Sequence, residues 1–148
     1  MECGLSISVV DPDPDYLGIK IRGWNERFSG TTFIYAECSS LSGLAAQIAG
    51  FPKGIPDERV FVFGSKDPRV AGGYCRLRLR TIGGVGHAML DIEIDDKSEH
   101  DDSPGLAAFS NPIAAASVDD FVGALRRVEF ARKGDAMLPP GRTPCIQS

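Results

Sequence analysis

The sequence is poor in the residues that most often carry out catalysis or bind metal ions. It has two histidines, His87 and His100, and four cysteines, none of which lies within metal-ligand spacing of another. The G-x-S-x-G and H-E-x-x-H motifs and the phosphate-binding Walker loop are also absent. We therefore predict that the protein holds no metal and no cofactor. The absence of these motifs favours a non-catalytic protein over an enzyme.

Long apolar runs and concentrated positive charge are missing as well. No stretch approaches the ~20 apolar residues that cross a bilayer, and the first residues, MECGLSISVVDPD, lack the segments of a signal peptide. The formal net charge is −4, whereas a general nucleic-acid binder needs a concentrated basic surface. We therefore predict a cytoplasmic protein that binds neither membranes nor nucleic acids.

The four cysteines do not form the closely spaced set of a secreted, disulfide-rich domain. Cys38 and Cys75 stand in apolar segments, where a cysteine usually behaves as a small buried hydrophobe. Cys3 and Cys145 stand near the two ends of the sequence, and we predict free thiols at both positions.

The hydrophobic pattern predicts a mixture of strands and helices. Apolar and polar residues alternate in the stretches that we assign to strands: 5–10, 16–24, 31–38, 59–63, two within 73–96, and an edge strand broken at Asn111-Pro112 within 106–116. Apolar residues recur at helical spacing over 41–48 and 118–128. The order β-β-β-α-β-β-β-β-α predicts an α+β fold with a single antiparallel sheet of about 6–7 strands and two helices.

The length of the chain and its prolines predict one domain followed by a tail. We assign residues 1–133 to a single α+β domain and residues 134–148, which include three prolines, to a Pro-rich C-terminal tail. The stretch 31–38 is apolar on both faces, and we expect it in the centre of the sheet. One face of the sheet should carry the helices, and the other should contact solvent or a partner.

The segment 73–96 predicts a hairpin with one aliphatic face and one charged face. Arginines alternate with leucines in its first strand, and acids alternate with aliphatic residues in its second. Burial contributes roughly 1.5–3 kcal/mol per large aliphatic side chain, whereas a cross-strand ion pair contributes only about 0.2–1 kcal/mol. Burial should therefore set the register. Whether Leu79 pairs with Ile92 or with Leu90, Arg78 and Arg80 then face Asp91 and Glu93.

This hairpin supplies the candidate binding residues: Tyr74, Arg76, Arg78, Arg80 and His87. The arginine row has two interpretations, a salt-bridged face in solvent or a recognition patch for an anionic partner. His87 follows the glycine-rich loop 83–86, and it is either an exposed or loop-anchoring histidine or part of a site.

The order of elements carries a resemblance. The stretch 86–92, GHAMLDI, begins the second strand of the hairpin, which stands between the predicted helices around 41–48 and 121–125. Over about residues 19–128, this pattern resembles small bacterial proteins of unknown function, some of which resemble the immunity proteins found beside bacterial polymorphic toxins. The resemblance implies a bacterial, cytoplasmic protein and assigns no catalytic residue.

These observations lead to three functional hypotheses. The first is a non-catalytic binding or interaction module, such as an immunity-type protein, with a protein partner on the charged sheet face. The second is a small-ligand-binding or enzymatic protein with a site near His87 that uses Tyr35, Tyr74 or an acid. The third is a dimeric structural subunit, because an antiparallel sheet of this size leaves two edges to cover.

Overall fold

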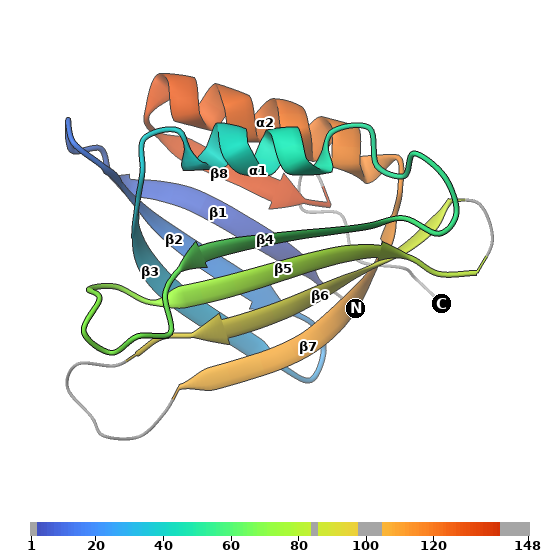
Figure 1. Cartoon of the computed structure of the whole chain (residues 1–148), viewed down its shortest axis with the longest axis horizontal. Helices are drawn as coiled ribbons and strands as arrows, with labels where there is room; N and C mark the ends of the chain where they lie inside the picture. The colour runs from blue at the N-terminus through green and yellow to red at the C-terminus, as the bar shows by residue number, and fades with distance from the viewer. Residues whose placement is uncertain (1–2, 84–85, 98–104, 140–148) are drawn as a thin grey trace.

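The computed structural model describes residues 3–83, 86–97 and 105–139, which form eight strands and two helices (Figure 1). In chain order they are β1 (Gly4–Asp11), β2 (Leu17–Trp24), β3 (Ser29–Ala36), α1 (Ser40–Ile48), β4 (Glu58–Gly64), β5 (Tyr74–Thr81), β6 (His87–Asp95), β7 (Leu106–Ala114), α2 (Ser117–Ala131) and β8 (Gly134–Leu138). All seven predicted strands and both predicted helices are present, so the α+β class and the antiparallel pairing are confirmed.

The prediction of a single sheet is wrong, because the strands form two four-stranded antiparallel sheets. The first sheet has the order β3-β2-β1-β8 and the second has the order β4-β5-β6-β7. Strands β1 to β3 pair through local hairpins, as do β4 to β7, and α1 separates the two groups in the chain. Each sheet has one apolar face, and the two apolar faces cover each other instead of both being covered by helices.

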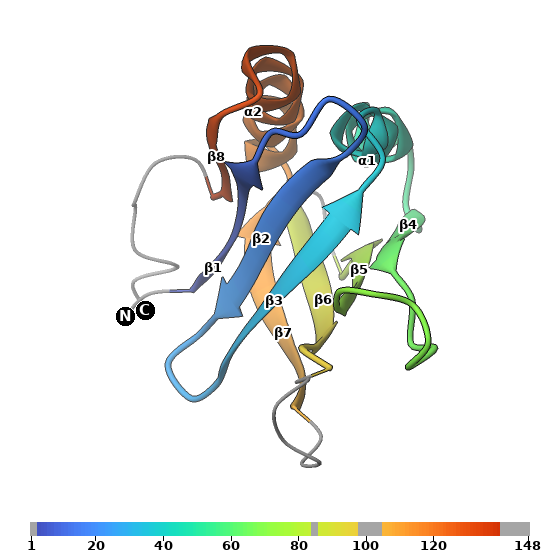
Figure 2. The ribbon, with the colours of Figure 1, turned by 90° about the vertical axis from the view of Figure 1, so that its left-hand side faces the viewer.

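The two sheets pack closely where they cross, as the two layers in Figure 2 show. A Cβ added at Gly23 of β2 would come within 3.1 Å of Ile92 in β6, and one added at Gly30 would meet Ala107 in β7. The buried Asn111 of β7 joins the layers by donating hydrogen bonds to the backbone oxygens of Gly4 and Trp24. The absence of side chains at these glycines therefore lets the layers approach.

Strand β3 lies at an edge of the first sheet and not at its centre as predicted. Its inward residues, including Ile34, are buried, but Phe33 and Tyr35 are exposed on the outer face. Apolar residues on both faces suggested burial on both faces, which is why the sequence was misleading here. Strand β7 does lie at an edge, as predicted, but its pairing with β6 runs through Asn111 and Pro112 without a break.

Part of the predicted tail belongs to the fold. Residues 134–138 form β8, which pairs antiparallel with β1, and Ala136 and Leu138 are buried. Only two inward positions alternate in this short strand, and Pro139 follows directly, so the hydrophobic pattern is too brief to predict it. Residues 140–148 of the predicted tail lie outside the described residues.

The two helices cover the side of the sandwich between β8 and β4 (Figure 1). Helix α2 packs on β8 and α1, and the buried stripe predicted over 118–128 is confirmed. Ser39, at the N-cap position of α1, makes no side-chain hydrogen bond to the helix. Instead Glu129 of α2 accepts hydrogen bonds from the backbone N–H and the hydroxyl of Ser42, so the first turn of α1 is satisfied by the neighbouring helix.

The cysteines follow the sequence prediction only in part. Cys75 is buried as predicted, and burial raises the pKa of its thiol. Cys38 is only half-buried. Cys3 is bonded in a disulfide, so the prediction of a free thiol there is wrong, and Cys145 lies outside the described residues.

Candidate functional site

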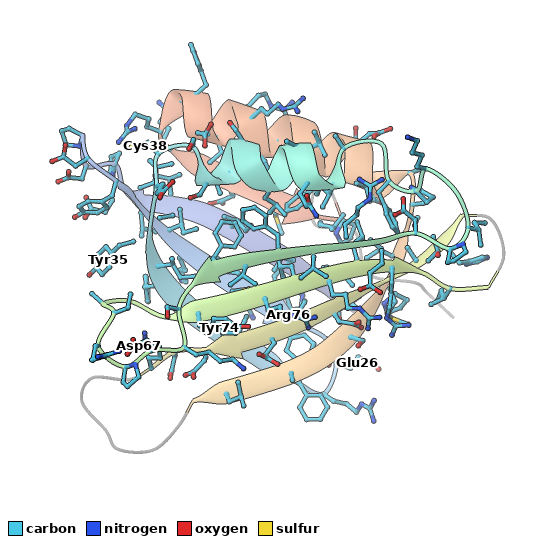
Figure 3. The ribbon with its side chains drawn as sticks, viewed as in Figure 1. Glu26, Tyr35, Cys38, Asp67, Tyr74 and Arg76 are labelled. Atoms are coloured by element: carbon cyan, nitrogen blue, oxygen red, sulfur yellow. The ribbon has the colours of Figure 1, made fainter. Side chains whose placement is uncertain are left out.

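The candidate site is the outer face of the second sheet. The hairpin places its arginines and acids on this face as predicted, but Arg80 lies opposite Met89 and not opposite Glu93. Leu79 pairs with Leu90, and both side chains are buried against the first sheet. This pairing sets Arg78 opposite Asp91 and Arg76 opposite Glu93 on the outer face. Figure 3 shows Tyr74 and Arg76 along β5 on this face.

Asp91 is the centre of the ion pairs on this face. The Arg80 guanidinium donates two hydrogen bonds to it, at 2.8 and 3.2 Å, and Arg78 donates a third at 3.2 Å. The hydroxyl of Ser110 in β7 donates a fourth, at 2.6 Å. Burial alone would raise the pKa of Asp91, but the hydrogen bonds from Arg80 and Ser110 and the nearby positive charges outweigh it and lower the pKa.

Two further ion pairs use residues that the sequence analysis did not include. Glu58 of β4 accepts a hydrogen bond from Arg78 at 2.9 Å, and Lys66 lies 3.0 Å from the carboxylate of Glu93. The Lys66 ammonium also stands 5.0 Å from the centre of the Tyr74 ring, which is largely buried beneath it. Burial raises the pKa of Tyr74, with the Glu93 charge as a second cause. Glu58, Val60 and Val62 are spaced two residues apart in β4 and therefore share one face. This spacing is the signal that could have placed Glu58 on the outer face.

Arg76 differs from the other two arginines of the row. It is half-buried, and it makes no hydrogen bond or ion pair with any described residue, since its cross-strand neighbour Glu93 is paired with Lys66. Its other neighbour is Val62 of β4, which is exposed. A hollow of about 260 Å³ opens beside Arg76 and reaches Ala108 and Ser110 of β7.

The structure does not bring His87 together with the residues proposed to work with it. His87 is exposed at the start of β6, near the end of β5 that carries Thr81, while Tyr74 lies at the opposite end of β5. Tyr35 belongs to the first sheet, where its ring contacts that of Tyr16 at 5.5 Å between centroids. The hypothesis of a ligand or catalytic site around His87 therefore gains no support from this arrangement.

Residues 3–83, 86–97 and 105–139 offer neither a metal site nor a membrane span. Within them no three histidine, cysteine or acidic side chains gather closely enough to bind a metal ion. Neither of the two helices there has the length and apolar character that a membrane span requires. His100, the second histidine, lies outside these ranges.

Comparison with known proteins gives no family. Neither a family model, nor a curated protein, nor a solved structure matches the chain. Functional interpretation therefore depends on the chemistry of the outer face alone.

Proposed function

We propose that the chain is a non-catalytic binding module that captures a protein partner on the outer face of its second sheet. The observation that carries this proposal is that the Arg76 guanidinium has no partner among the described residues, in a row where Arg78 and Arg80 both have carboxylate partners. A partner that brings a carboxylate to Arg76 would gain a charge-assisted, bidentate hydrogen bond. A basic partner would bind this face less well, because the carboxylates of Asp91 and Glu93 already form ion pairs with Arg80 and Lys66.

The surroundings of Arg76 suit a protein surface. Exposed Val62 lies on one side, and the hollow with Ala108 lies on the other. Protein interfaces concentrate their binding energy in a few anchors, and arginines flanked by apolar contacts are frequent among them. We therefore expect Arg76 to anchor the partner, whereas Arg78 and Arg80 form ion pairs within the sheet.

An immunity-type protein would be a module of this kind, and that class, with its bacterial origin, stays within the proposal. The cytoplasmic location that the sequence predicts is less well supported. The disulfide at Cys3 is more typical of oxidising compartments than of the cytoplasm.

The proposal is tested with the single substitution Arg76→Ser in a pull-down from lysate of the source organism. We expect the wild-type chain to retain a partner that Arg76→Ser loses, while the thermal midpoint stays unchanged because no internal hydrogen bond is removed. Arg69→Ser is the matched control, since the Arg69 side chain is 88% exposed and lies in the loop before β5. Equal capture by Arg76→Ser, or no capture by the wild type, would contradict the proposal.

A further inference from the structure

The exposed face of α2 carries opposite charges at its two ends. Asp119 and Asp120 lie in the first turn, and Arg126 and Arg127 lie in the second half of the helix. All four side chains are exposed, and none forms an ion pair with another described residue. The two acids are stabilised at the positive, N-terminal end of the helix dipole. The dipole does not explain why the residues between the acids and the arginines on this face are small.

Small residues separate the two charged ends. Asp120, Gly123, Arg127 and Phe130 recur at intervals of three, four and three residues, so they lie on one face of the helix, opposite its buried stripe. Between α2 and β8 this face has a hollow of about 480 Å³, bounded by Gly123 and Ala124 and on the strand by Asp135 and Met137. Figure 2 shows this helix at the top of the molecule, beside α1 and above β8.

Phe130 is the most exposed large hydrophobic residue of the described chain, at 93%. It follows Arg126 and Arg127 on the outward side of the last turn of α2. Burying such a ring would contribute roughly 1.5–3 kcal/mol. A contact that covers this face of α2 would therefore gain from burying the Phe130 ring.

We infer that a second copy of this chain covers this face through an antiparallel contact between the two α2 helices. A two-fold axis between Gly123 and Ala124 places Arg127 of each copy opposite Asp120 of the other, so the contact contains two identical ion pairs. The Arg127 guanidinium, which in the single chain lies 3.3 Å from the position of a Cβ on Gly123, turns to the opposing Asp120, and the small residues at the crossing then let the helix axes approach. Phe130 then reaches the first turn of the opposing helix, where Ala116 is exposed.

The charge order selects this occupant and this orientation. A parallel helix pair would set acids against acids and arginines against arginines, whereas a two-fold antiparallel pair sets each against its opposite. An anionic membrane would be repelled by Asp119 and Asp120, and a purely basic or purely acidic partner would match only one end. The contact surface is one helix face, so we expect a dimer of micromolar affinity that weakens as salt is added.

The test is sedimentation velocity on the full chain and on three variants. The wild type should reach twice the 15.8 kDa mass of the chain as its concentration rises to about 0.1 mM. Asp120→Arg alone and Arg127→Asp alone should remain monomeric at this concentration. An equimolar mixture of these two variants should dimerise again, because each chain then offers the charge that the other lacks at both ion pairs.

The third variant, Phe130→Ser, controls for misfolding. It replaces an exposed ring, so it should keep the thermal midpoint of the wild type and still weaken the dimer at least tenfold. A monomeric wild type at about 0.1 mM would overturn the inference. Dimers of unchanged affinity in the single variants, or a mixture that stays monomeric, would also overturn it.

Discussion

Two aspartate–arginine ion pairs, one at the start of β4 and one in the loop after it, have the same geometry and differ in their surroundings. Arg59 donates two hydrogen bonds to Asp57, at 3.0 and 2.9 Å, and Arg69 donates two to Asp67, at 3.1 and 2.9 Å. Each arginine stands two residues after its aspartate. The Arg59 and Asp57 side chains are 19% and 14% exposed, whereas those of Arg69 and Asp67 are 88% and 33% exposed.

The second difference is what else each arginine binds. Arg59 also donates hydrogen bonds to the backbone oxygens of Gln47 and Ala49, so its positive charge stands at the C-terminal end of α1. Its guanidinium lies 5.8 Å from the centre of the Phe51 ring. Arg69 has no such contact with another element among the described residues. An identical local pair is therefore structural in one place and incidental in the other, and burial decides which.

The largest effect is expected from removing the buried arginine. Arg59→Met leaves the Asp57 carboxylate and two helix-end carbonyls without their donor, and we expect a loss of about 3 kcal/mol in the free energy of unfolding. Urea denaturation of the two variants measures this. Arg69→Met is the matched control, and it should unfold at the wild-type urea midpoint because an exposed ion pair is screened by solvent. Equal midpoints for both variants would remove the distinction between the pairs.

A smaller effect is expected from pH. The hydrogen bond from Arg59, and after it the one from the Lys53 N–H, lower the pKa of Asp57 from 3.8 to about 2. Because the folded-state pKa lies below the unfolded one, this stabilisation is complete above about pH 5 and is lost as the pH falls through about 2. The loss amounts to about 2 kcal/mol.

Urea titrations over this pH range should therefore show a shallower acid dependence in Asp57→Asn than in the wild type. Asp67→Asn should change the slope less, because the hydrogen bonds that lower the pKa of Asp67 come from Arg69, whose side chain is 88% exposed. Parallel curves for the wild type and Asp57→Asn would show that the carboxylate of Asp57 gains nothing from the fold.

The smallest effect concerns Lys97, which holds the loop that contains Asp67 and Arg69. The Lys97 ammonium donates hydrogen bonds to the backbone oxygens of Ser65, Asp67 and Val70 at 2.8–2.9 Å. Lys97→Met should cost about 1 kcal/mol and accelerate hydrogen exchange at the Val70 amide, which bonds Asp67. Arg69→Met should leave that exchange rate unchanged. If hydrogen exchange at the Val70 amide were faster in both variants, the ion pair between Arg69 and Asp67 would also stabilise the loop.

The sequence predicted local pairing well and the arrangement of the sheets poorly. Strict alternation in β5 and β6 determines which face is buried, because a slip of one residue would expose the leucines and isoleucines. It leaves both Leu90 and Ile92 as possible partners of Leu79, and the structure pairs Leu79 with Leu90. Whether neighbouring hairpins join edge to edge or stack face to face depends on contacts such as those at Gly23, which no periodicity reveals. Strand β8 pairs with β1 across almost the whole chain, so no local signal predicts it.

The candidate site was predictable to the same extent. Side chains alternate between the two faces of a strand, so Arg76, Arg78 and Arg80 lie on one face. The hairpin alone accounts for the ion pairs of Arg78 and Arg80 with Asp91. The isolation of Arg76 depends on Lys66, which reaches Glu93 from a separate loop. The residues that distinguish a paired arginine from an available one are thus supplied by β4 and the loop after it.

The pairing of β1 with β8 also bears on how the chain is synthesised. Strand β1 receives its second neighbour only after residue 138 has been made, so one of its edges stays open while β2 to β7 are synthesised. An open strand edge is a template for pairing with other chains. Long-range pairing of this kind also slows folding. Chains that stop before Gly134 should therefore aggregate while they are still bound to the ribosome, even though seven of the eight strands are already present.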